Sequence, residues 1–143
     1  MLHNVPPILS PDLLCSLRAM GHGDDIVIAD ANFPATSLAR RCHRLDGVSA
    51  TEVLEAILTL LPLDTFVPDP AIVMQVVDEP DTIPPVVAAF QTIINQRADH
   101  PVTISRIDRF AFYARAKEAF AIVQTGETRL YGNIILKKGV IGA

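Results

Sequence analysis

Cysteine, basic residues and long apolar runs are all scarce in this sequence. Two of the 143 residues are cysteines, too few for a disulfide framework, so we expect a reduced, cytoplasmic protein. The formal net charge is −4 and the isoelectric point is about 5.4, which argues against nucleic acid or an anionic membrane as a partner. No stretch approaches the roughly 20 apolar residues of a transmembrane helix, and residues 1–10 lack the basic and apolar regions of a signal peptide.

Hydrophobic residues, in contrast, make up 50% of the sequence, and charged residues make up only 20%. A chain of this length can bury a core without disulfides or metals, so we predict a single domain over residues 1–143. The apolar content is high for a monomer of this size. It favours a homo-oligomer with buried subunit interfaces, although a well-packed core could absorb the same residues.

Helix signals recur along the chain. Ser10 can cap a helix over residues 11–20, and Gly21 can end it in a left-handed conformation. Ser49 and Glu52 have the spacing of a capping box at the start of another helix. Further helices are predicted after the proline-rich stretch 78–85 and over residues 108–119, the latter capped by Asp108.

Strand signals alternate with these helices. Residues 26–29 (IVIA) and 71–77 (AIVMQVV) are apolar runs of the kind found in strands buried on both faces. Other strands are predicted at residues 42–45, 102–107, 120–126 and 131–140. The alternation favours an α/β fold with a largely parallel central sheet and helices on both faces.

Several polar residues stand at the ends of predicted strands. Asp30 follows the strand at 26–29, Arg109 comes just after the strand at 102–107, and the tripeptide Tyr131-Gly132-Asn133 opens the last strand. Ligands of open α/β sheets bind beyond the carboxyl ends of the strands. The tripeptide shares that edge only if the last strand runs antiparallel to its neighbours.

His22 is not placed by this rule, because it precedes its strand. It can reach the same cleft only through the path of its own loop or by entering the site of a neighbouring subunit. An imidazole that titrates near neutrality can move protons. A histidine between Gly21 and Gly23 is also commonly an exposed loop residue.

Ordinary structural roles are open for the other residues as well. The Asp30 side chain can cap the turn that follows it, and Tyr131-Gly132-Asn133 can be turn residues alone. Arg106 and Asp108 can form a surface ion pair of little energetic weight.

Sharper motifs are absent. No HxH, HExxH or CxxC spacing indicates a metal, and no GxxxxGK[ST] or GxGxxG indicates phosphate binding. Asp30-Ala31-Asn32 faintly resembles the nucleophile loop of haloacid-dehalogenase-type phosphatases, but Asn32 stands where that family has a second aspartate. The set that remains, an imidazole, a carboxylate, a guanidinium, a phenol and an amide, suits a polyhydroxylated ligand without a metal.

Three long blocks together resemble one family. They are MGHGDDIVIADANFP at 20–34, RIDRFAFYARAKEAFAIVQTGE at 106–127 and YGNIILKKGV at 131–140. These blocks are similar to the sugar-mutarotase family (RbsD/FucU), over nearly the whole chain. The Gly-His-Gly-Asp form at 21–24 and the RIDRFAFY block resemble its fucose branch. Members of that branch often have histidine where Asn32 stands.

The resemblance implies an isomerase that interconverts the α and β anomers of a free sugar, L-fucose or a related aldose, without a metal or an organic cofactor. It also implies a three-layer α/β/α sandwich assembled into a homo-oligomeric ring, typically a decamer, with sites near subunit interfaces. His22 matches the family's proton donor. Asp30, Arg109, Tyr131, Gly132 and Asn133 match its substrate-binding positions.

The general base and the sugar stay open at this stage. Mutarotation needs an acid at the ring oxygen and a base at the anomeric hydroxyl. His22 fits the acid, whereas Asp30, Tyr131 or a bound water could be the base. Activity of the D-ribose pyranase type, a non-catalytic monosaccharide-binding module and a metal-dependent phosphohydrolase are the alternatives.

Overall fold

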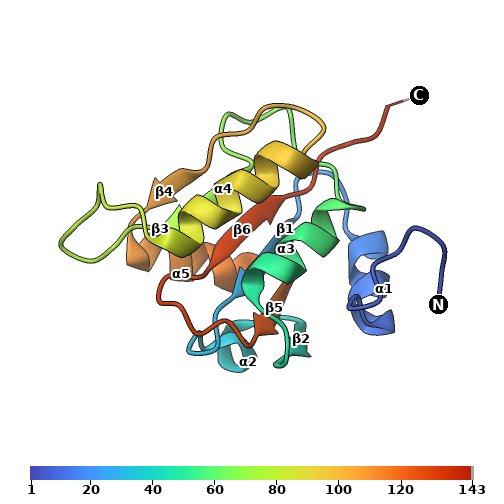
Figure 1. The fold of residues 1–143 in the computed structure, drawn as a ribbon, viewed down its shortest axis with the longest axis horizontal. Helices are drawn as coiled ribbons and strands as arrows, with labels where there is room; N and C mark the ends of the chain where they lie inside the picture. Colours follow the sequence, from blue (N-terminus) through green and yellow to red (C-terminus); the bar gives the residue numbers. More distant parts are fainter. Residues whose placement is uncertain (143) are drawn as a thin grey trace.

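The computed structural model describes residues 1–142 and is built around a six-stranded sheet (Figure 1). The strand order is β2-β5-β1-β6-β3-β4, in which β6 is antiparallel to both of its neighbours and the other pairs are parallel. The strands are β1 (Asp25–Ala29), β2 (Cys42–Leu45), β3 (Ala71–Met74), β4 (Ser105–Ile107), β5 (Ala121–Thr125) and β6 (Ile134–Lys137).

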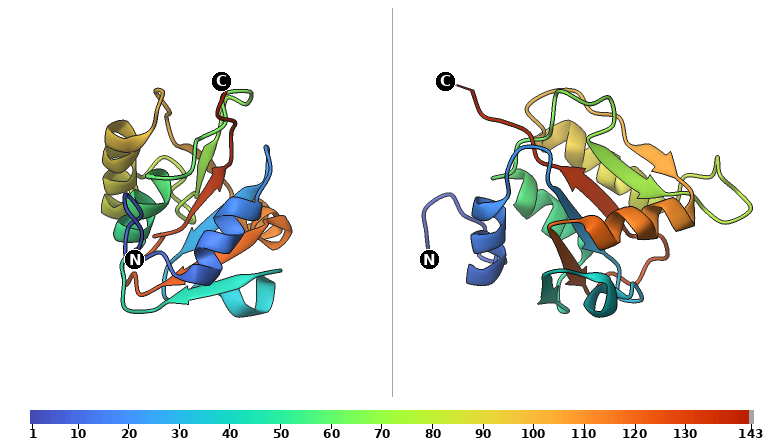
Figure 2. Two further views of the ribbon diagram at one scale, coloured as in Figure 1. Left: turned by 90° about the vertical axis from the view of Figure 1, so that its right-hand side faces the viewer. Right: turned by 180° about the vertical axis from the view of Figure 1, so that it is seen from behind.

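Helices cover both faces of this sheet. They are α1 (Pro11–Ala19), α2 (Ala35–Leu38), α3 (Ala50–Leu58), α4 (Pro85–Arg97) and α5 (Arg109–Glu118). Alternation along β1 sends Ile26 and Ile28 into a core shared with α1, α3 and α4, and Val27 and Ala29 into a core shared with α2 and α5. Figure 2 shows the two helical layers with the sheet between them. The predicted three-layer α/β/α sandwich is confirmed.

The predicted helix starts are also found. The Ser10 hydroxyl accepts from the backbone N–H of Leu13, and Ser49 and Glu52 form the reciprocal capping box of α3. The Asp108 carboxylate accepts from two backbone N–H groups in the first turn of α5. Each cap pairs N–H groups that have no partner inside their own helix.

The prediction that Gly21 ends the first helix in a left-handed conformation was wrong. The helix α1 ends at Ala19, Met20 has a φ of −56°, and the left-handed residue is Gly23 with a φ of 85°. The ammonium group of Lys138 donates to the backbone oxygens of Leu17 and Met20. The carbonyls at the helix end are therefore paired without a left-handed cap.

Four predicted strands are shorter than expected, and side-chain hydrogen bonds explain where one of them begins. The strand predicted at 71–77 ends at Met74, and the strand predicted at 120–126 covers Ala121–Thr125. The strand predicted from residue 102 begins at Ser105, because the Gln91 amide pairs with the backbone oxygen of Val102 and the backbone N–H of Ile104. The last strand begins at Ile134 rather than 131, because residues 131–133 form a turn. The short helix α2 is not among the predicted helices.

The direction of β6 decides what lies at the sheet edges. Because β6 is antiparallel, its first residues lie at the edge where β1, β3, β4 and β5 end. Asn133 therefore stands beside Asp30. Of the helices in residues 1–142, none has the length and apolar character to cross a membrane.

Candidate functional site

A pocket of about 230 Å³ opens at the carboxyl edge of the sheet. It is formed by the residues after β1, the end of β3, the start of α5 and the turn before β6. Its walls are Asp30, Asn32, Phe33, Met74, Val77, Arg109, Tyr113, Leu130, Tyr131 and Asn133. The structure thus brings Asp30, Arg109, Tyr131 and Asn133 together, with Gly132 in the backbone between the last two.

Asp30 and Asn133 form the buried base of this pocket. The Asn133 side-chain oxygen accepts from the Asp30 N–H at 2.8 Å, and its Nδ2 donates to the Asp30 carboxylate at 2.7 Å. The other Asp30 carboxylate oxygen accepts from the Asn32 N–H at 2.9 Å. The capping role considered for Asp30 is therefore real. Since each carboxylate oxygen can accept two hydrogen bonds, both keep a free lone pair for a ligand hydroxyl.

The turn before β6 holds its backbone in an uncommon shape. Tyr131 has a φ of 64°, a left-handed conformation that is strained for a bulky residue. Its hydroxyl accepts from the N–H of Val77 at 3.2 Å, and its carbonyl accepts from the N–H of Asn133 at 2.8 Å. A Cβ on Gly132 would lie 2.6 Å from Cγ of Glu127, so this position has no room for a side chain.

Arg109 is the exposed cation of the pocket. It is the first residue of α5, and its guanidinium carbon lies 5.0 Å from the centre of the Phe110 ring. No carboxylate of residues 1–142 lies within 4.0 Å of it, which leaves its donors available for a ligand. The surface ion pair considered for Arg106 and Asp108 is not formed within the described chain, because Arg106 donates to the Pro80 carbonyl and Asp108 caps α5.

Sequence reasoning missed the aromatic wall. Tyr113 lines the pocket and stacks on Phe33, with ring centres 5.1 Å apart and planes within 5° of parallel. Tyr113 stands four residues after Arg109 on α5. Residues at this spacing share a helix face, so the spacing itself was a signal that could have found it.

His22 lies at the opposite edge of the sheet. It precedes β1, whereas Asp30 follows β1, and at about 3.3 Å per residue the five residues of that strand span roughly 16 Å. The imidazole is 44% exposed and lies 5.2 Å from the ring of Phe66, centre to centre. Within one chain, His22 therefore does not reach the pocket of Asp30.

Asp64 is the partner of His22 and was not found from the sequence. Its carboxylate is 3% exposed and accepts from Nε2 of His22 at 3.0 Å and from the N–H of Phe66 at 3.1 Å. Burial alone raises the pKa of this carboxyl. The hydrogen bonds from Phe66 and His22, together with the nearby charges of His22 and Lys137, outweigh that effect and hold the pKa below its ordinary value. An ionised carboxylate that accepts from Nε2 fixes the orientation of the ring.

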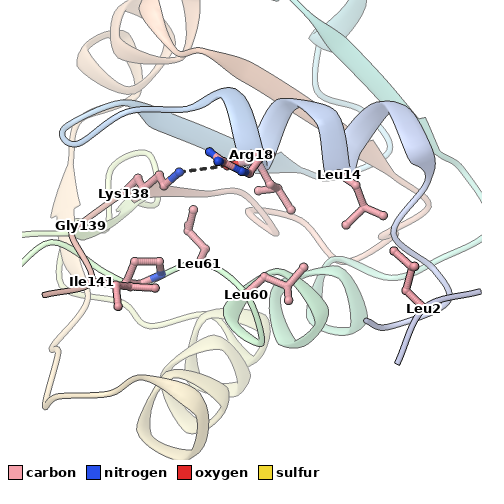
Figure 3. A pocket seen from close by; sticks show the side chains of 10 residues that line it. Leu2, Leu14, Arg18, Leu60, Leu61, Lys138, Gly139 and Ile141 are labelled. Atoms are coloured by element: carbon pink, nitrogen blue, oxygen red, sulfur yellow. Dashed lines mark hydrogen bonds between the residues drawn. The ribbon is translucent and has the colours of Figure 1, made fainter. Parts of the chain in front are cut away.

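An apolar cleft of about 510 Å³ lies between α1 and the residues after α3 and β6. Figure 3 shows Leu14, Leu60, Leu61 and Ile141 facing it, with Arg18 and Lys138 as its basic residues. It holds none of the predicted site residues. In residues 1–142, no three His, Cys, Asp or Glu side chains gather closely enough to hold a metal ion.

The three-layer fold and the polar pocket at Asp30 are those of a member of one family. The model of the RbsD / FucU transport protein family matches residues 3–141, and the chain belongs to that family.

Relatives and solved structures agree with this assignment. The chain is 50% identical to the fucose mutarotase of Bos taurus, covering 99% of this chain and 95% of the relative, and 46% identical to the L-fucose mutarotase of Histophilus somni (strain 2336), covering 98% and 97%. It is similar to the crystal structure of the fucose mutarotase in complex with L-fucose from Streptococcus pneumoniae (TM-score 0.91, 48% identity, 99% and 100% covered). Bacillus subtilis RbsD complexed with D-ribose, at 21% identity and a TM-score of 0.72, shares the fold (94% and 95% covered).

Proposed function

We propose that this protein is an L-fucose mutarotase, an isomerase that interconverts the α and β anomers of the free sugar, and that residues 1–143 act as one domain. The observation that carries this proposal is the pocket in which the Asp30–Asn133 pair, Arg109 and Tyr131 face one space of about 230 Å³. Its donors and acceptors match vicinal hydroxyl groups. The similarity to fucose mutarotases over nearly the full length supports the same sugar.

The reaction opens a hemiacetal and closes it again on the other face. The bond between the anomeric carbon and the ring oxygen breaks, the ring oxygen gains a proton, and the anomeric hydroxyl loses one as the aldehyde forms. Rotation of the aldehyde and the reverse proton transfers give the other anomer. An acid and a base on opposite sides of that bond are required.

His22 is the acid in this proposal. Its Nε2–H is directed at Asp64, so the ring presents its other nitrogen to the substrate, and the buried carboxylate stabilises the imidazolium that donates the proton. The anomeric proton goes to the opposite side of the pocket, to Asp30, Tyr131 or a bound water. Arg109 holds the remaining hydroxyl groups of the sugar. Asn133 holds the Asp30 carboxylate in place.

This mechanism requires a second copy of the chain, because His22 and Asp30 lie at opposite edges of one sheet. A head-to-tail contact brings the His22 edge of one copy to the pocket of the next, and such contacts form a ring when the rotation between successive copies closes. Exposed apolar residues at both ends support self-association, with Phe110 and Leu130 beside the pocket and Leu2 and Ile141 at the apolar cleft. We propose a cytoplasmic homo-oligomer, a decameric ring; both cysteines are free.

Exchange between the anomers is the direct test. Saturation of the α anomeric proton of L-fucose in an NMR experiment should reduce the β signal faster when the protein is present, with EDTA making no difference. Acceleration with D-ribose alone would indicate activity of the pyranase type. Saturable binding of L-fucose with unchanged exchange would indicate a binding module and would contradict the proposal.

A further inference from the structure

A buried carboxylate lies against the turn before β6 and does not line the pocket. Glu127 follows β5 and is 3% exposed. Its two carboxylate oxygens accept from Nε and Nη2 of Arg129 at 2.9 and 2.8 Å, and one of them also accepts from the Arg129 backbone N–H at 3.0 Å. The hydrogen bonds from Arg129 lower the pKa of the Glu127 carboxyl. These hydrogen bonds between Glu127 and Arg129 hold the start of the loop between β5 and β6 in a turn.

The backbone of Glu127 is bonded to the end of β1. Its carbonyl accepts from the N–H of Ala31 at 2.9 Å. Its own N–H donates to the Thr125 hydroxyl at 3.2 Å, and that hydroxyl donates to the carbonyl of Ala29 at 2.7 Å. The residues on both sides of Asp30 are thus tied to the Thr125–Glu127 segment.

The side chain of Glu127 reaches the turn before β6. A Cβ added to Gly132 would lie 2.6 Å from Cγ of Glu127 and 3.1 Å from the carbonyl oxygen of Arg129. The neighbouring Tyr131 is held in its left-handed conformation. A strained backbone of this kind persists only while its surroundings fix it.

We propose that Glu127, paired with Arg129, is a positioning residue of the sugar site, which holds the turn after β1 and the turn before β6 at the spacing that Asp30 and Asn133 require. It acts through those residues and does not touch the sugar. The proposal rests on the proposed function for its kinetic test. Without the carboxylate, the Arg129 guanidinium returns to solvent, the loop loosens, and the Asp30–Asn133 pair loses its fixed geometry.

The test is the split between KM and kcat in Glu127→Ala and Glu127→Gln. Because misplaced binding groups weaken sugar binding, Glu127→Ala should raise KM for L-fucose about tenfold, with kcat per folded chain within about twofold of wild type. Glu127→Gln keeps the Cγ beneath Gly132 and should raise KM about threefold. A purely structural role would reduce the folded fraction and hence the maximal rate, and would leave KM unchanged.

The matched control is Glu55→Ala, which removes an exposed carboxylate from its ion pair with Arg97 and should leave KM unchanged. An independent readout follows the NMR signals of the Asn133 side-chain amide and the Ala31 N–H. Both should shift and exchange faster with solvent in Glu127→Ala. A KM within twofold of wild type together with unchanged Asn133 and Ala31 signals overturns the proposal. Unchanged anomer exchange with wild-type protein would instead contradict the mutarotase function, while the NMR readout still tests the positioning role.

Discussion

Nε2 of His22 lies 3.0 Å from the buried carboxylate of Asp64, at the edge of the sheet opposite to Asp30. One chain therefore carries an imidazole–carboxylate pair at one end of β1 and a polar pocket at the other. The proposed chemistry needs both at a single sugar. A second copy of the chain must supply one of them.

Mixing two inactive variants tests this division. His22→Ala and Asp30→Asn should each lose activity, and chains co-refolded in equal amounts should regain it at about a quarter of the sites, where an intact His22 of one copy meets an intact Asp30 of the next. Anomer exchange of the mixture measures the recovery. His22→Ala chains mixed with differently tagged His22→Ala chains are the control. No recovery in properly assembled mixtures would indicate a site within one chain.

The lowered pKa of Asp64 predicts how its contribution to stability depends on pH. A carboxyl whose pKa is lowered on folding stabilises the protein above its unfolded pKa, and this stabilisation disappears as the pH falls through the folded pKa. The difference in unfolding free energy between wild type and Asp64→Asn should be largest near pH 5, where His22 is protonated and Asp64 is ionised, and should shrink below about pH 4. Urea unfolding across this range measures it. A difference that keeps growing as the pH falls below about 4 would contradict the assignment.

Asp64→Asn should also slow catalysis. The amide keeps the shape of the side chain but cannot stabilise an imidazolium, so kcat should fall at least tenfold while KM changes little. His100, which pairs with the exposed Asp99, offers the matched control, and Asp99→Asn should leave kcat unchanged. Equal rates for wild type and Asp64→Asn would remove Asp64 from the mechanism.

The variant Asn133→Asp, which places a second carboxyl against Asp30, should become less stable as the pH rises. Two carboxylates at 2.7 Å cannot both ionise without repulsion. One carboxyl keeps its proton at low pH and must ionise as the pH rises, so we expect a loss of about 3 kcal/mol at pH 8 and a smaller loss at pH 5. Thermal unfolding at the two pH values measures this. Asn95→Asp on the exposed face of α4 should show no such dependence.

Gly132→Ala should destabilise the protein by about 1–3 kcal/mol, because the added methyl group would collide with Cγ of Glu127. Gly47→Ala is the control, since nothing lies within 4 Å of a Cβ at that position, and its effect should stay within about 0.5 kcal/mol. Chemical denaturation of both variants measures the difference. Equal stability would show that the loop relaxes freely around position 132.

The fold was largely predictable because its signals are local. The caps at Ser10, Ser49 and Asp108 and the apolar run at 26–29 each act within a few residues, and all four are found. The strand ends were less predictable. The side chain of Gln91 is hydrogen-bonded to the backbone of Val102 and Ile104, which are 11 and 13 residues away in sequence. These two bonds decide where β4 begins.

The places of the site residues at the ends of strands were predictable from the sequence, but which of them meet depends on the topology of the sheet. Asp30 and Asn133 meet because β6 is antiparallel, a direction that depends on packing and is not written in local sequence. Asp64 was missed because its contact with His22 joins residues 42 positions apart. The role of His22 as acid rests on the family resemblance and stays a prediction.

The most direct test compares wild type with His22→Ala in the exchange of α- and β-L-fucose. Because positioned proton transfer contributes roughly 10²–10⁴ in rate, the variant should lose at least 100-fold of the acceleration. Its affinity for the sugar and its thermal stability should remain those of wild type. Wild-type protein that fails to accelerate exchange, or a His22→Ala variant as fast as wild type, would contradict the account.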